Sequence, residues 1–352
     1  MDRFSLRRTG GRAAFLRCFL TITVVVLAAC DCTLVTDRHH ELTVLSYNVE
    51  NLFDDVYDGT EYQEYDPRYG WSNRGYHAKL KNVARVIADS PSGGADIVAL
   101  QEIENRKTLE DLVEGYLRFE KYRDIVVVPT ANAAVNVGIL SRLPVTGVRT
   151  HTVHAEYPAR YILEVRVRWS GHDIVVFVNH WKSKYGGGAY ATEPLRIAHA
   201  RVLEERISRL ARREPRTAIV VAGDLNSSVD EFDRRGQAYP TALVPVGGPP
   251  AGGIFVTHDT GEVSVGGDRA ILFSPWHLAE HPGSYEYDGV WKTIDHFLLC
   301  PVVIDPIGVK FAEFEVVVHD YLVTQTGRPY RWNPRSMTGY SDHLPILLRL
   351  KR

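Results

Sequence analysis

The chain has 352 residues, of which 45% are hydrophobic and 24% are charged, with a formal net charge of −2. This is the composition of a soluble globular protein with enough apolar material for a large core, and it excludes a low-complexity or repeat protein. The absence of a strong positive charge argues against a protein that binds polyanions tightly and non-specifically, because such proteins need a basic footprint.

The first 29 residues have the pattern of a bacterial export signal. Five arginines precede an apolar segment from Phe19 to Ala29, which is too short to span a bilayer comfortably. The segment ends in Leu-Ala-Ala-Cys30, which resembles a lipobox. Cys30 is therefore the expected lipidation site, and a plain secretory signal with an accidental cysteine is the alternative.

The expected organisation is a lipoprotein signal peptide (1–29), a tether (30–41) and one domain (42–352). Lipid chains on Cys30 would hold the mature protein on a membrane, on the periplasmic side or at the cell surface. Cleavage removes five Arg and one Asp, so the formal charge changes from −2 to −6. Of the four cysteines, Cys32 and Cys300 are left as a candidate pair, and no spacing is typical of a zinc site.

Apolar periodicity along the domain predicts alternating groups of strands and helices. Helical spacing predicts helices over 76–89, 107–118 and 193–213. Strands are predicted over 42–48, 96–100, 124–129, 135–140, 145–153, 161–169, 172–179, 218–224, 270–274, 291–300, 311–318 and 346–350. Helices that fall between strand groups, with early hairpins, favour an α/β protein with antiparallel or mixed sheets in packed layers.

Residues 53–75 are predicted to form a long polar loop that is rich in tyrosine and acidic side chains. Loops of this length are usually functional or disordered. The aromatic side chains could stack on a substrate ring, or they could pack on one another in a surface flap.

The tetrapeptide Gly223-Asp224-Leu225-Asn226 ends a predicted buried strand and would bring a carboxylate and a carboxamide to the rim of a sheet. Asp can orient or deprotonate a water, and Asn can hold a phosphate oxygen. On its own, such a strand end is as well explained by turn formation. Similar polar groups, however, recur at the ends of other predicted strands: Asn48, Glu102, Asn179-His180, Asp295 and Asp342-His343.

Taken in this order between apolar strands, these groups resemble the endonuclease/exonuclease/phosphatase superfamily. The matching stretches are SYNVENLF (46–53), LQEIEN (100–105), NHWKSK (179–184), GDLN (223–226), IDHFLL (294–299) and SDHLP (341–345). The resemblance implies a four-layer α/β/β/α sandwich of two packed mixed sheets flanked by helices. It also implies an active site at one edge of the sheets.

The resemblance implies a divalent metal, usually Mg²⁺, with Mn²⁺ or Ca²⁺ as alternatives. Asn48, Glu102 and Asp342 match the residues at that metal. Independently of the resemblance, Mg²⁺ is a hard cation that suits one or two carboxylates and retained waters.

The remaining matches imply the groups that act on the phosphate. Asp224 matches the residue that orients or deprotonates the attacking water, and Asn226 matches the phosphate ligand beside it. His180 and His343 match two phosphate-contacting histidines, and Asp295 matches the acid that fixes the tautomer of His343. An Asp–His pair makes a cationic phosphate clamp near neutral pH, because a neighbouring carboxylate favours the imidazolium.

Other polar residues near these motifs are expected to have structural roles rather than to take part in the reaction. We expect His258 and His296 to be solvated or capping residues. Glu50 and Glu104 are expected to support the site from behind or to lie on the surface. Arg196, on the predicted helix after NHWKSK, is expected to support the site.

The leading hypothesis is an exported, lipid-anchored and monomeric Mg²⁺-dependent phosphodiesterase of nuclease type that acts on nucleic acid. NHWKSK favours this hypothesis, because it looks more like the extracellular nuclease-type members than like the 5-phosphatases. The alternative is hydrolysis of a small or lipid phosphoester, in the manner of a sphingomyelinase or an inositol phosphatase. A second alternative is a catalytically silent surface lipoprotein that keeps the fold for binding.

Overall fold

A computed structural model describes residues 40–352, apart from 156–158, 250–252, 267–268 and 306. The predicted signal peptide, Cys30 and Cys32 lie outside the described residues. Residues Leu42–Arg352 form one compact unit. In the described part of the chain, no helix combines the length and the apolar character needed to cross a membrane.

The first sheet has six strands in the order β16-β17-β1-β2-β4-β3. Their bounds are β1 (Glu41–Leu52), β2 (Ile97–Ile103), β3 (Asp124–Val128), β4 (Asn136–Ser141), β16 (Lys310–Val316) and β17 (Ile346–Lys351). Strands β1 and β2 are parallel, and helix α2 (Asn73–Asp89) lies in the crossover between them. Strand β4 is antiparallel to both of its neighbours and β16 is antiparallel to β17, so the sheet is mixed.

The second sheet has nine strands in the order β5-β6-β7-β8-β15-β12-β10-β9, with β11 paired to β12. Their bounds are β5 (Val145–His151), β6 (Ile162–Trp169), β7 (His172–His180), β8 (Ala218–Asp224), β9 (Leu243–Pro245), β10 (Ile254–Thr257), β11 (Ser264–Gly266), β12 (Arg269–Phe273) and β15 (Asp295–Leu299). Helix α4 (Gly188–Arg213) connects the parallel strands β7 and β8. The hairpin predicted at Ser170-Gly171 is confirmed, and both residues have the positive φ of a type I′ turn, 47° and 86°.

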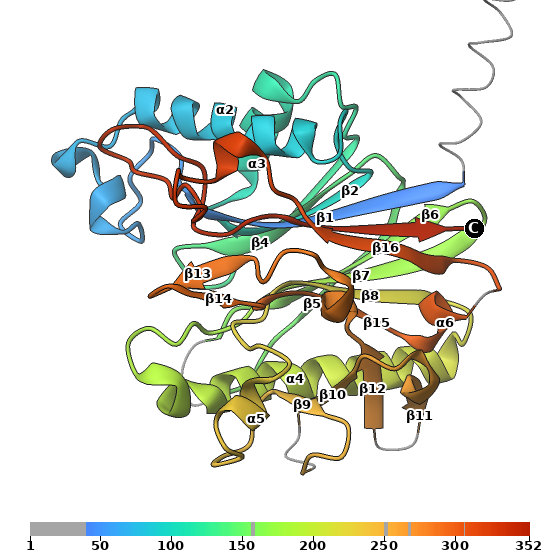
Figure 1. Ribbon diagram of the computed structural model, residues 1–352. Helices are drawn as coiled ribbons and strands as arrows, with labels where there is room; N and C mark the ends of the chain where they lie inside the picture. The colour runs from blue at the N-terminus through green and yellow to red at the C-terminus, as the bar shows by residue number, and fades with distance from the viewer. Residues whose placement is uncertain (1–39, 156–158, 250–252, 267–268, 306) are drawn as a thin grey trace, which may run out of the picture. The chain divides into compact units, whose positions relative to one another are not determined.

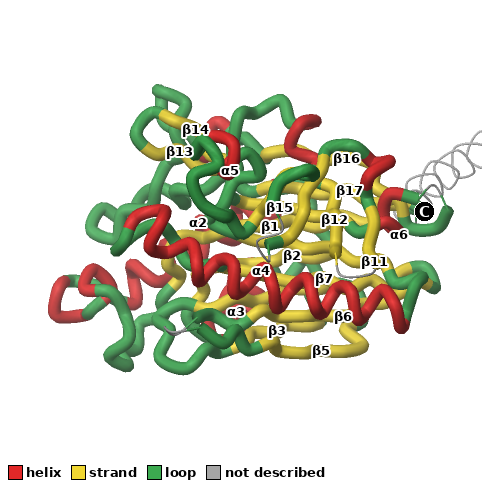
Figure 2. Tube along the Cα trace, turned by 90° about the horizontal axis from the view of Figure 1, so that it is seen from below, coloured by secondary structure: helices red, strands yellow, loops and turns green. Residues whose placement is uncertain are grey.

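Helices cover the outer face of each sheet, which gives four layers (Figure 1). Helices α2 and α3 (Arg106–Tyr116) lie on the first sheet, and α4 runs across the strands of the second (Figures 1 and 2). Alternation along β7 explains the packing, because Val176 and Val178 join the core between the sheets whereas Val175 and Phe177 pack on the α4 side. The predicted α/β/β/α sandwich of two mixed sheets is therefore confirmed.

Several short elements complete the fold. The hairpin β13 (Tyr285–Tyr287) and β14 (Val290–Lys292) stands outside the two large sheets. Helices α5 (Glu231–Arg234) and α6 (Pro301–Ile304) are each one turn long. The bridge between Tyr285 and His343 ties the hairpin to the loop that precedes β17.

The 53–75 loop packs on itself around two 3₁₀ turns, Gln63–Tyr65 and Pro67–Tyr69. The ring of Tyr65 lies between Phe53 and Trp71, with centroid distances of 4.7 and 4.9 Å. Both Tyr65 and Trp71 are buried. The interpretation as a self-packed flap holds for these side chains, whereas Tyr62 remains exposed at its edge.

Candidate active site

Three neighbouring strands of the second sheet carry polar residues side by side at one edge. Asp224 at the end of β8 pairs in register with His180 at the end of β7 and with Asp295 at the start of β15. In the first sheet, Asn48 of β1 pairs with Gln101 of β2, the residue before Glu102. The two sheets therefore present their polar strand ends toward one another.

Irregular backbone in β1 and β2 sets the direction of these side chains. The register shifts between Asn48 and Leu52 and again between Gln101 and Ile103. Within these bulges Glu50, Asn51 and Glu102 adopt φ values of 52°, 62° and 64°. Left-handed non-glycine residues cost free energy and bulges re-aim side chains, so their clustering here indicates a functional edge.

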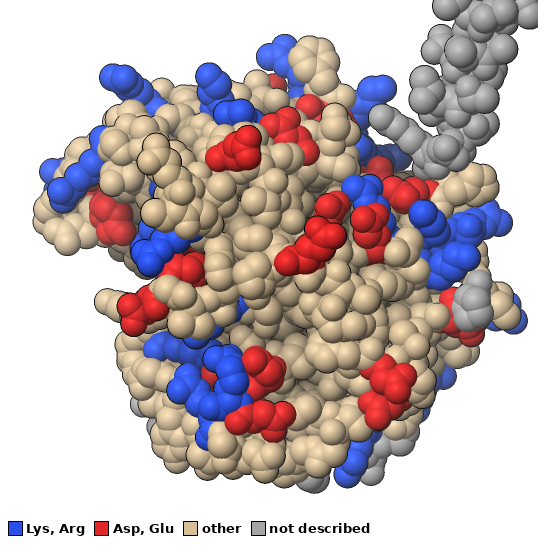
Figure 3. All heavy atoms as spheres, in the orientation of Figure 1, with Lys and Arg blue, Asp and Glu red and all other residues tan. Residues whose placement is uncertain are grey.

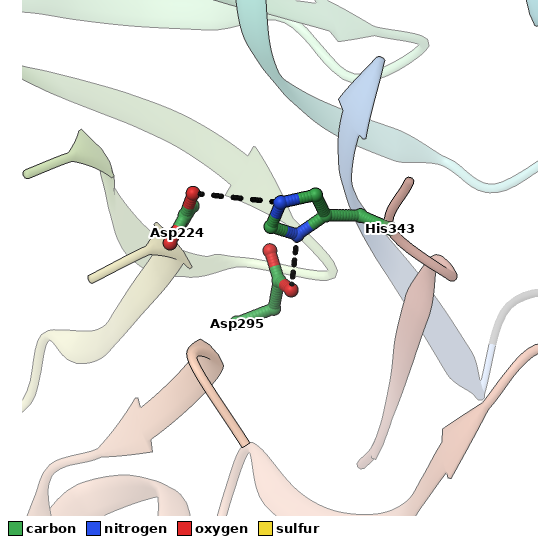
Figure 4. A group of neighbouring side chains, drawn as sticks. All are labelled: Asp224, Asp295 and His343. Carbon is green, nitrogen blue, oxygen red and sulfur yellow. Dashed lines mark hydrogen bonds and ion pairs between the residues drawn. The ribbon is translucent and has the colours of Figure 1, made fainter. Parts of the chain in front are cut away.

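Figure 4 shows His343 between two aspartates. His343 Nδ1 donates to Asp295 Oδ2 at 2.8 Å, and its Nε2 lies 3.9 Å from Asp224 Oδ2. Ser284 Oγ donates to the same Asp295 oxygen at 2.5 Å. Burial alone would lower the pKa of His343, but the Asp295 carboxylate outweighs it and raises that pKa well above its usual value. His343 is therefore an imidazolium at neutral pH.

Asp224 is a buried carboxylate that accepts two hydrogen bonds. Its Oδ1 accepts from the backbone N–H of Asn226 at 2.9 Å, and its Oδ2 accepts from Asn48 Nδ2 at 3.1 Å. Burial raises the pKa of Asp224 to about 7, against the opposing charge of His343. A carboxylate that titrates near neutral pH can accept a proton from water at that pH.

Glu102 and Asp342 form an acidic corner beside this trio. Asn48 Nδ2 donates to Glu102 Oε1 at 3.1 Å, and the backbone N–H of Asn51 donates to Oε2 at 3.0 Å. Burial and the negative charge of Asp342 raise the pKa of Glu102. The Oδ1 atom of Asn51 is buried and has no hydrogen-bond partner within the described residues. Two carboxylates that repel each other, next to a residue whose buried amide oxygen is unsatisfied, fit a hard divalent cation.

His180 differs in charge from His343. Its Nε2 lies 3.6 Å from Glu102 Oε1 and 3.7 Å from Asp224 Oδ2, and the side chain is almost fully buried. Burial, followed by the positive charges of Arg160 and His343, lowers the pKa of His180 well below its usual value. The site therefore combines one cationic and one neutral histidine.

The structure brings all of the predicted site residues of the folded domain to one place. They are Asn48, Glu102, His180, Asp224, Asn226, Asp295, Asp342 and His343. Asp342 Oδ1 lies 3.9 Å from His343 Nε2, which places the metal-type and phosphate-type residues next to each other.

Sequence reasoning missed three residues that hold this site together. Ser341 Oγ donates to the backbone oxygen of Asn48 at 2.7 Å and accepts from the backbone N–H of His343 at 3.0 Å. The ring of Tyr285 lies 4.7 Å from that of His343, and Ser284 anchors Asp295. Ser341 is the first residue of SDHLP and could have been found, whereas Ser284 and Tyr285 lie between two predicted strands, 270–274 and 291–300, and belong to none of the matching stretches.

The prediction for His296 was wrong. Its side chain is fully buried in β15, and its Nε2 lies 2.8 Å from the backbone oxygen of Ser227, so it is a core residue and not a solvated one. Strand β15 begins at Asp295, so alternation turns His296 to the side of the sheet opposite Asp295. His258 is exposed, as expected.

Glu50 and Arg196 support the site from behind. Glu50 is buried, pairs with Arg331 and accepts from the backbone N–H of Trp332 at 2.9 Å. Arg196 is buried and donates to the backbone oxygen of Lys182 at 2.9 Å, which fixes the loop after His180. Glu104 is buried rather than on the surface. Cys300 has a buried thiol that forms no disulfide within the described residues, which do not include Cys32.

A model of the endonuclease/exonuclease/phosphatase family matches residues 43–235, which is more than half of the chain. The chain belongs to this family. Members of the endonuclease/exonuclease/phosphatase family are metal-dependent phosphoester hydrolases. Among the described residues, two groups of side chains lie close enough together to hold a metal ion: Asp224, Asp295 and His343, and Asp58, Glu61 and Glu104. No curated protein matches the chain.

Solved structures share the family fold at low sequence identity. TDP2 from Caenorhabditis elegans has a TM-score of 0.53 and 14% identity over 89% of this chain and 98% of that chain. TDP2 from D. rerio, solved in complex with a single-strand DNA product, has a TM-score of 0.54 and 16% identity over 89% and 99%. A family protein from Bacteroides thetaiotaomicron has a TM-score of 0.52 and 15% identity over 88% and 97%. At these identities the likeness establishes the fold alone.

Proposed function

We propose that this protein is a divalent-metal-dependent phosphodiesterase of nuclease type. The observation that carries the proposal is the arrangement of Asp224 between a cationic His343 and a carboxylate-bearing corner at Glu102. Phosphodiester hydrolysis needs a base for water, positive charge for the phosphate, and help for the leaving oxygen. This edge of the sandwich supplies side chains for each requirement.

Each of the following residues has a separate role in the proposed reaction. Asp224 orients a water and accepts its proton, because its raised pKa matches the working pH. The His343 imidazolium, held by Asp295, donates to a non-bridging phosphate oxygen as negative charge builds there. The Asn226 carboxamide and the neutral His180 ring donate further hydrogen bonds to the phosphate.

Glu102 and Asp342 would hold the metal, with Asn48 orienting Glu102. A bound divalent cation supplies charge compensation to the phosphate and to the leaving oxygen. Mg²⁺ is the proposed ion, since it accepts one or two carboxylates and keeps several waters.

Nucleic acid is the proposed substrate class, supported by the single-strand DNA product in the D. rerio structure. The test is incubation of the purified domain with plasmid DNA, single-stranded DNA and RNA, each with Mg²⁺, Mn²⁺ or Ca²⁺ and with EDTA. We expect metal-dependent cleavage that EDTA abolishes. Absence of cleavage with every cation would overturn the assignment as a nuclease.

A small or lipid phosphoester is the second candidate, and one observation favours it. Figure 3 shows acidic and basic side chains interspersed over the visible face rather than one basic field, and the mature charge would be −6. Sphingomyelin and inositol phosphates in the same assay would separate the two candidates. A silent binding protein would hydrolyse neither class, and the complete set of polar groups speaks against it.

We further propose that the protein acts outside the cytoplasm as a monomer anchored through Cys30. The support is the basic and apolar pattern of residues 1–29 before that cysteine. Expression of the full chain and of Cys30→Ser, followed by membrane fractionation and mass spectrometry, tests the anchor. A Cys30→Ser protein that stays in the membrane fraction to the same extent would contradict it.

A further inference from the structure

The chain enters the folded unit at the end opposite the active site. Leu42 lies at the start of β1, and Asn48 of the site lies six positions further along the same strand. Likewise, β8 starts at Ala218 and ends at Asp224. At about 3.3 Å per residue, this basal end of the unit lies about 20 Å from the site. Figures 1 and 2 show the C-terminus and α6 at the basal end and the β13–β14 hairpin at the other.

Strand pairing gathers several turns at the basal end. Strands β1 and β2 are parallel and start together, and Lys310 pairs with Lys351, so β16 starts beside the C-terminus. A Cβ atom on Gly308 would lie 3.5 Å from Cε1 of His172, which places the segment before β16 next to the β6–β7 turn. The basal end comprises residues 89–96, 117–124, 142–144, 169–173, 212–217, 301–305, 307–310 and 351–352.

Two large apolar side chains stand out into solvent at the basal end. Phe119 and Ile307 are each 82% exposed, and among the described residues only one other large hydrophobic side chain, a tyrosine, is more exposed. Both turns are anchored, since Leu117 and Val309, two positions away, are buried and the N–H of Ile307 donates to Asp305 Oδ1 at 2.9 Å. The fold therefore presents these two side chains outward from fixed turns.

The basal end is more basic than the rest of the unit. Its turns hold ten Lys or Arg against seven Asp or Glu, whereas residues 42–352 as a whole hold 35 against 39. Ion pairs with arginines neutralise several of these acids, as for Asp96, Asp124 and Asp173. Exposed cations that have no carboxylate partner in the described part of the chain include Arg118, Lys121, Arg212, Arg213, Arg216 and Lys310. The basal end is therefore a cationic surface on an acidic unit.

We propose that the basal end docks on an anionic lipid bilayer, with Phe119 and Ile307 entering the interface and the surrounding cations facing the lipid phosphates. Apolar side chains flanked by Lys and Arg are typical of surfaces that bind in the plane of a membrane. The two kinds of side chain are adjacent here, because the Arg118 guanidinium lies 5.9 Å from the centre of the Phe119 ring and Lys310 follows Ile307 in the same turn. A polyanion such as DNA would also attract the cations, but a bilayer alone gives Ile307 an apolar environment.

The attachment of the chain supports the same orientation. The segment that leads back to Cys30 joins the unit at the basal end, so an acyl group on Cys30 and the basal end would act on one membrane. Two weak anchors together hold a protein on a bilayer much more firmly than either alone. In this orientation the active site faces away from the membrane, which favours phosphoesters in solution over bilayer lipids. Docking does not depend on the proposed reaction.

The test is sedimentation of residues 42–352 with vesicles, because this compact unit lacks Cys30 and binds only through its own surface. One set of vesicles contains equal parts of phosphatidylglycerol and phosphatidylcholine, and the other contains phosphatidylcholine alone. We expect at least about tenfold tighter binding to the anionic vesicles, weakening as salt is added.

Surface variants should separate the charged from the apolar contribution. Arg213→Gln should weaken binding to the anionic vesicles about fivefold, as the loss of one cation near an anionic surface would give. Phe119→Ser should also weaken binding about fivefold but leave the salt dependence as in the wild type. The matched control is Arg74→Gln, since Arg74 is also exposed but lies at the start of α2, next to the 53–75 loop. The control should bind as the wild type does.

Hydrogen exchange on the vesicles reports which end is covered. We expect slower exchange at 117–124 and 301–310, with no change at 53–75 and 284–292. Equal binding to both kinds of vesicle, no binding to either, or protection confined to 53–75 and 284–292 would overturn the inference. A reduced affinity of Arg213→Gln for single-stranded DNA in EDTA, with unchanged vesicle binding, would assign the cations to nucleic acid and overturn it as well. None of these measurements involves hydrolysis, so the proposed function stands or falls separately.

Discussion

Asp224 and His343 face each other across the site with pKa values that are both raised. Burial pushes the pKa of Asp224 up to about 7, and Asp295 pushes that of His343 well above its usual range. Asp295 contributes to both shifts, although burial is the larger cause for Asp224, and the sheet fixes Asp295 as the register partner of Asp224. The site therefore keeps a proton acceptor and a cationic donor 3.9 Å apart.

Replacing the base should remove most activity without unfolding the protein. Asp224→Asn keeps the shape of the side chain but cannot accept a proton, so we expect kcat/KM on a diester to fall by about 10²–10⁴. The measurement is initial rates with matched thermal unfolding curves. The control is Asp288→Asn, an exposed residue of the β13–β14 turn, which should keep the wild-type rate. A near-normal rate in Asp224→Asn would refute the assigned role.

Removing the partner of His343 should change the pH dependence of the reaction. Asp295 raises the pKa of His343, so the imidazolium persists to high pH in the wild type. In Asp295→Asn this pKa falls, and the alkaline limb of the kcat/KM profile should move to lower pH. Ser284→Ala, which removes one hydrogen bond to Asp295 but leaves its carboxylate, should move the limb much less. An unchanged profile in Asp295→Asn would contradict the imidazolium role.

At the scale of elements, the contact between β7 and β8 depends on one glycine. Gly223 has φ of +128°, and a Cβ atom there would lie 2.0 Å from the backbone oxygen of Asn179. The strands can approach closely only because residue 223 has no side chain, and this approach places His180 beside Asp224. Gly223, the first residue of GDLN, is therefore required for the packing of β7 against β8.

Gly223→Ala should therefore destabilise the protein strongly. We expect a loss of about 3–5 kcal/mol in the free energy of unfolding, because the strand pair must separate. Gly171→Ala is the control, since Gly171 also has positive φ but an added Cβ there would meet open space. That variant should lose only about 1–2 kcal/mol from backbone strain. Denaturant titration measures both, and equal losses would contradict the steric account.

Helix α4 is tied to the second sheet through a buried carboxylate in β6. Glu164 accepts from Arg206 of α4 at 2.6 and 2.7 Å and lies 2.7 Å from His151 of β5. Although burial opposes it, these partners lower the pKa of Glu164 to about 2. The ionised form is therefore favoured by folding.

Removing the Glu164 carboxylate should make the free energy of unfolding depend less on pH in the acidic range. The pKa of Glu164 is about 2 when folded and about 4.3 when unfolded, so its contribution is present above the unfolded value and is lost as pH falls toward 2. Glu164→Gln should cost about 1–2 kcal/mol near neutral pH, after screening by solvent, and the difference should vanish at low pH. Glu205→Gln, in an exposed pair with Arg209, is the control. A difference that is independent of pH would contradict the ionic explanation.

At the scale of the whole molecule, the acidic corner links metal binding to folding. A ligand that binds only the folded state raises its stability. We expect saturating Mg²⁺ to raise the unfolding temperature by about 5 °C. Glu102→Gln should lose this rise, whereas Glu280→Gln, an exposed residue, should keep it. A rise that persists in Glu102→Gln would place the cation elsewhere.

The sequence predicts the large elements and the polar strand ends, but not the backbone that aims them. Helices with apolar residues on one face and long buried strands carry strong periodicity, so α2, α4, β7 and β8 are found within a few residues of their observed bounds. The left-handed Glu50, Asn51 and Glu102 are not glycines and give no local signal. Between residues 228 and 284 the sequence predicts β12 but not β9, β10 and β11, because these strands are three or four residues long and depend on partners that are distant in sequence.

Ser341 donates to the backbone oxygen of Asn48 across 293 positions of sequence. The bond joins the first strand of the folded unit to the segment just before its last strand, β17, which carries Asp342 and His343. During synthesis, an emerging chain that ends before Ser341 carries Glu102, His180 and Asn226 but lacks both Asp342 and His343. The candidate site is therefore completed only when the segment before β17, the last strand to be made, has been added.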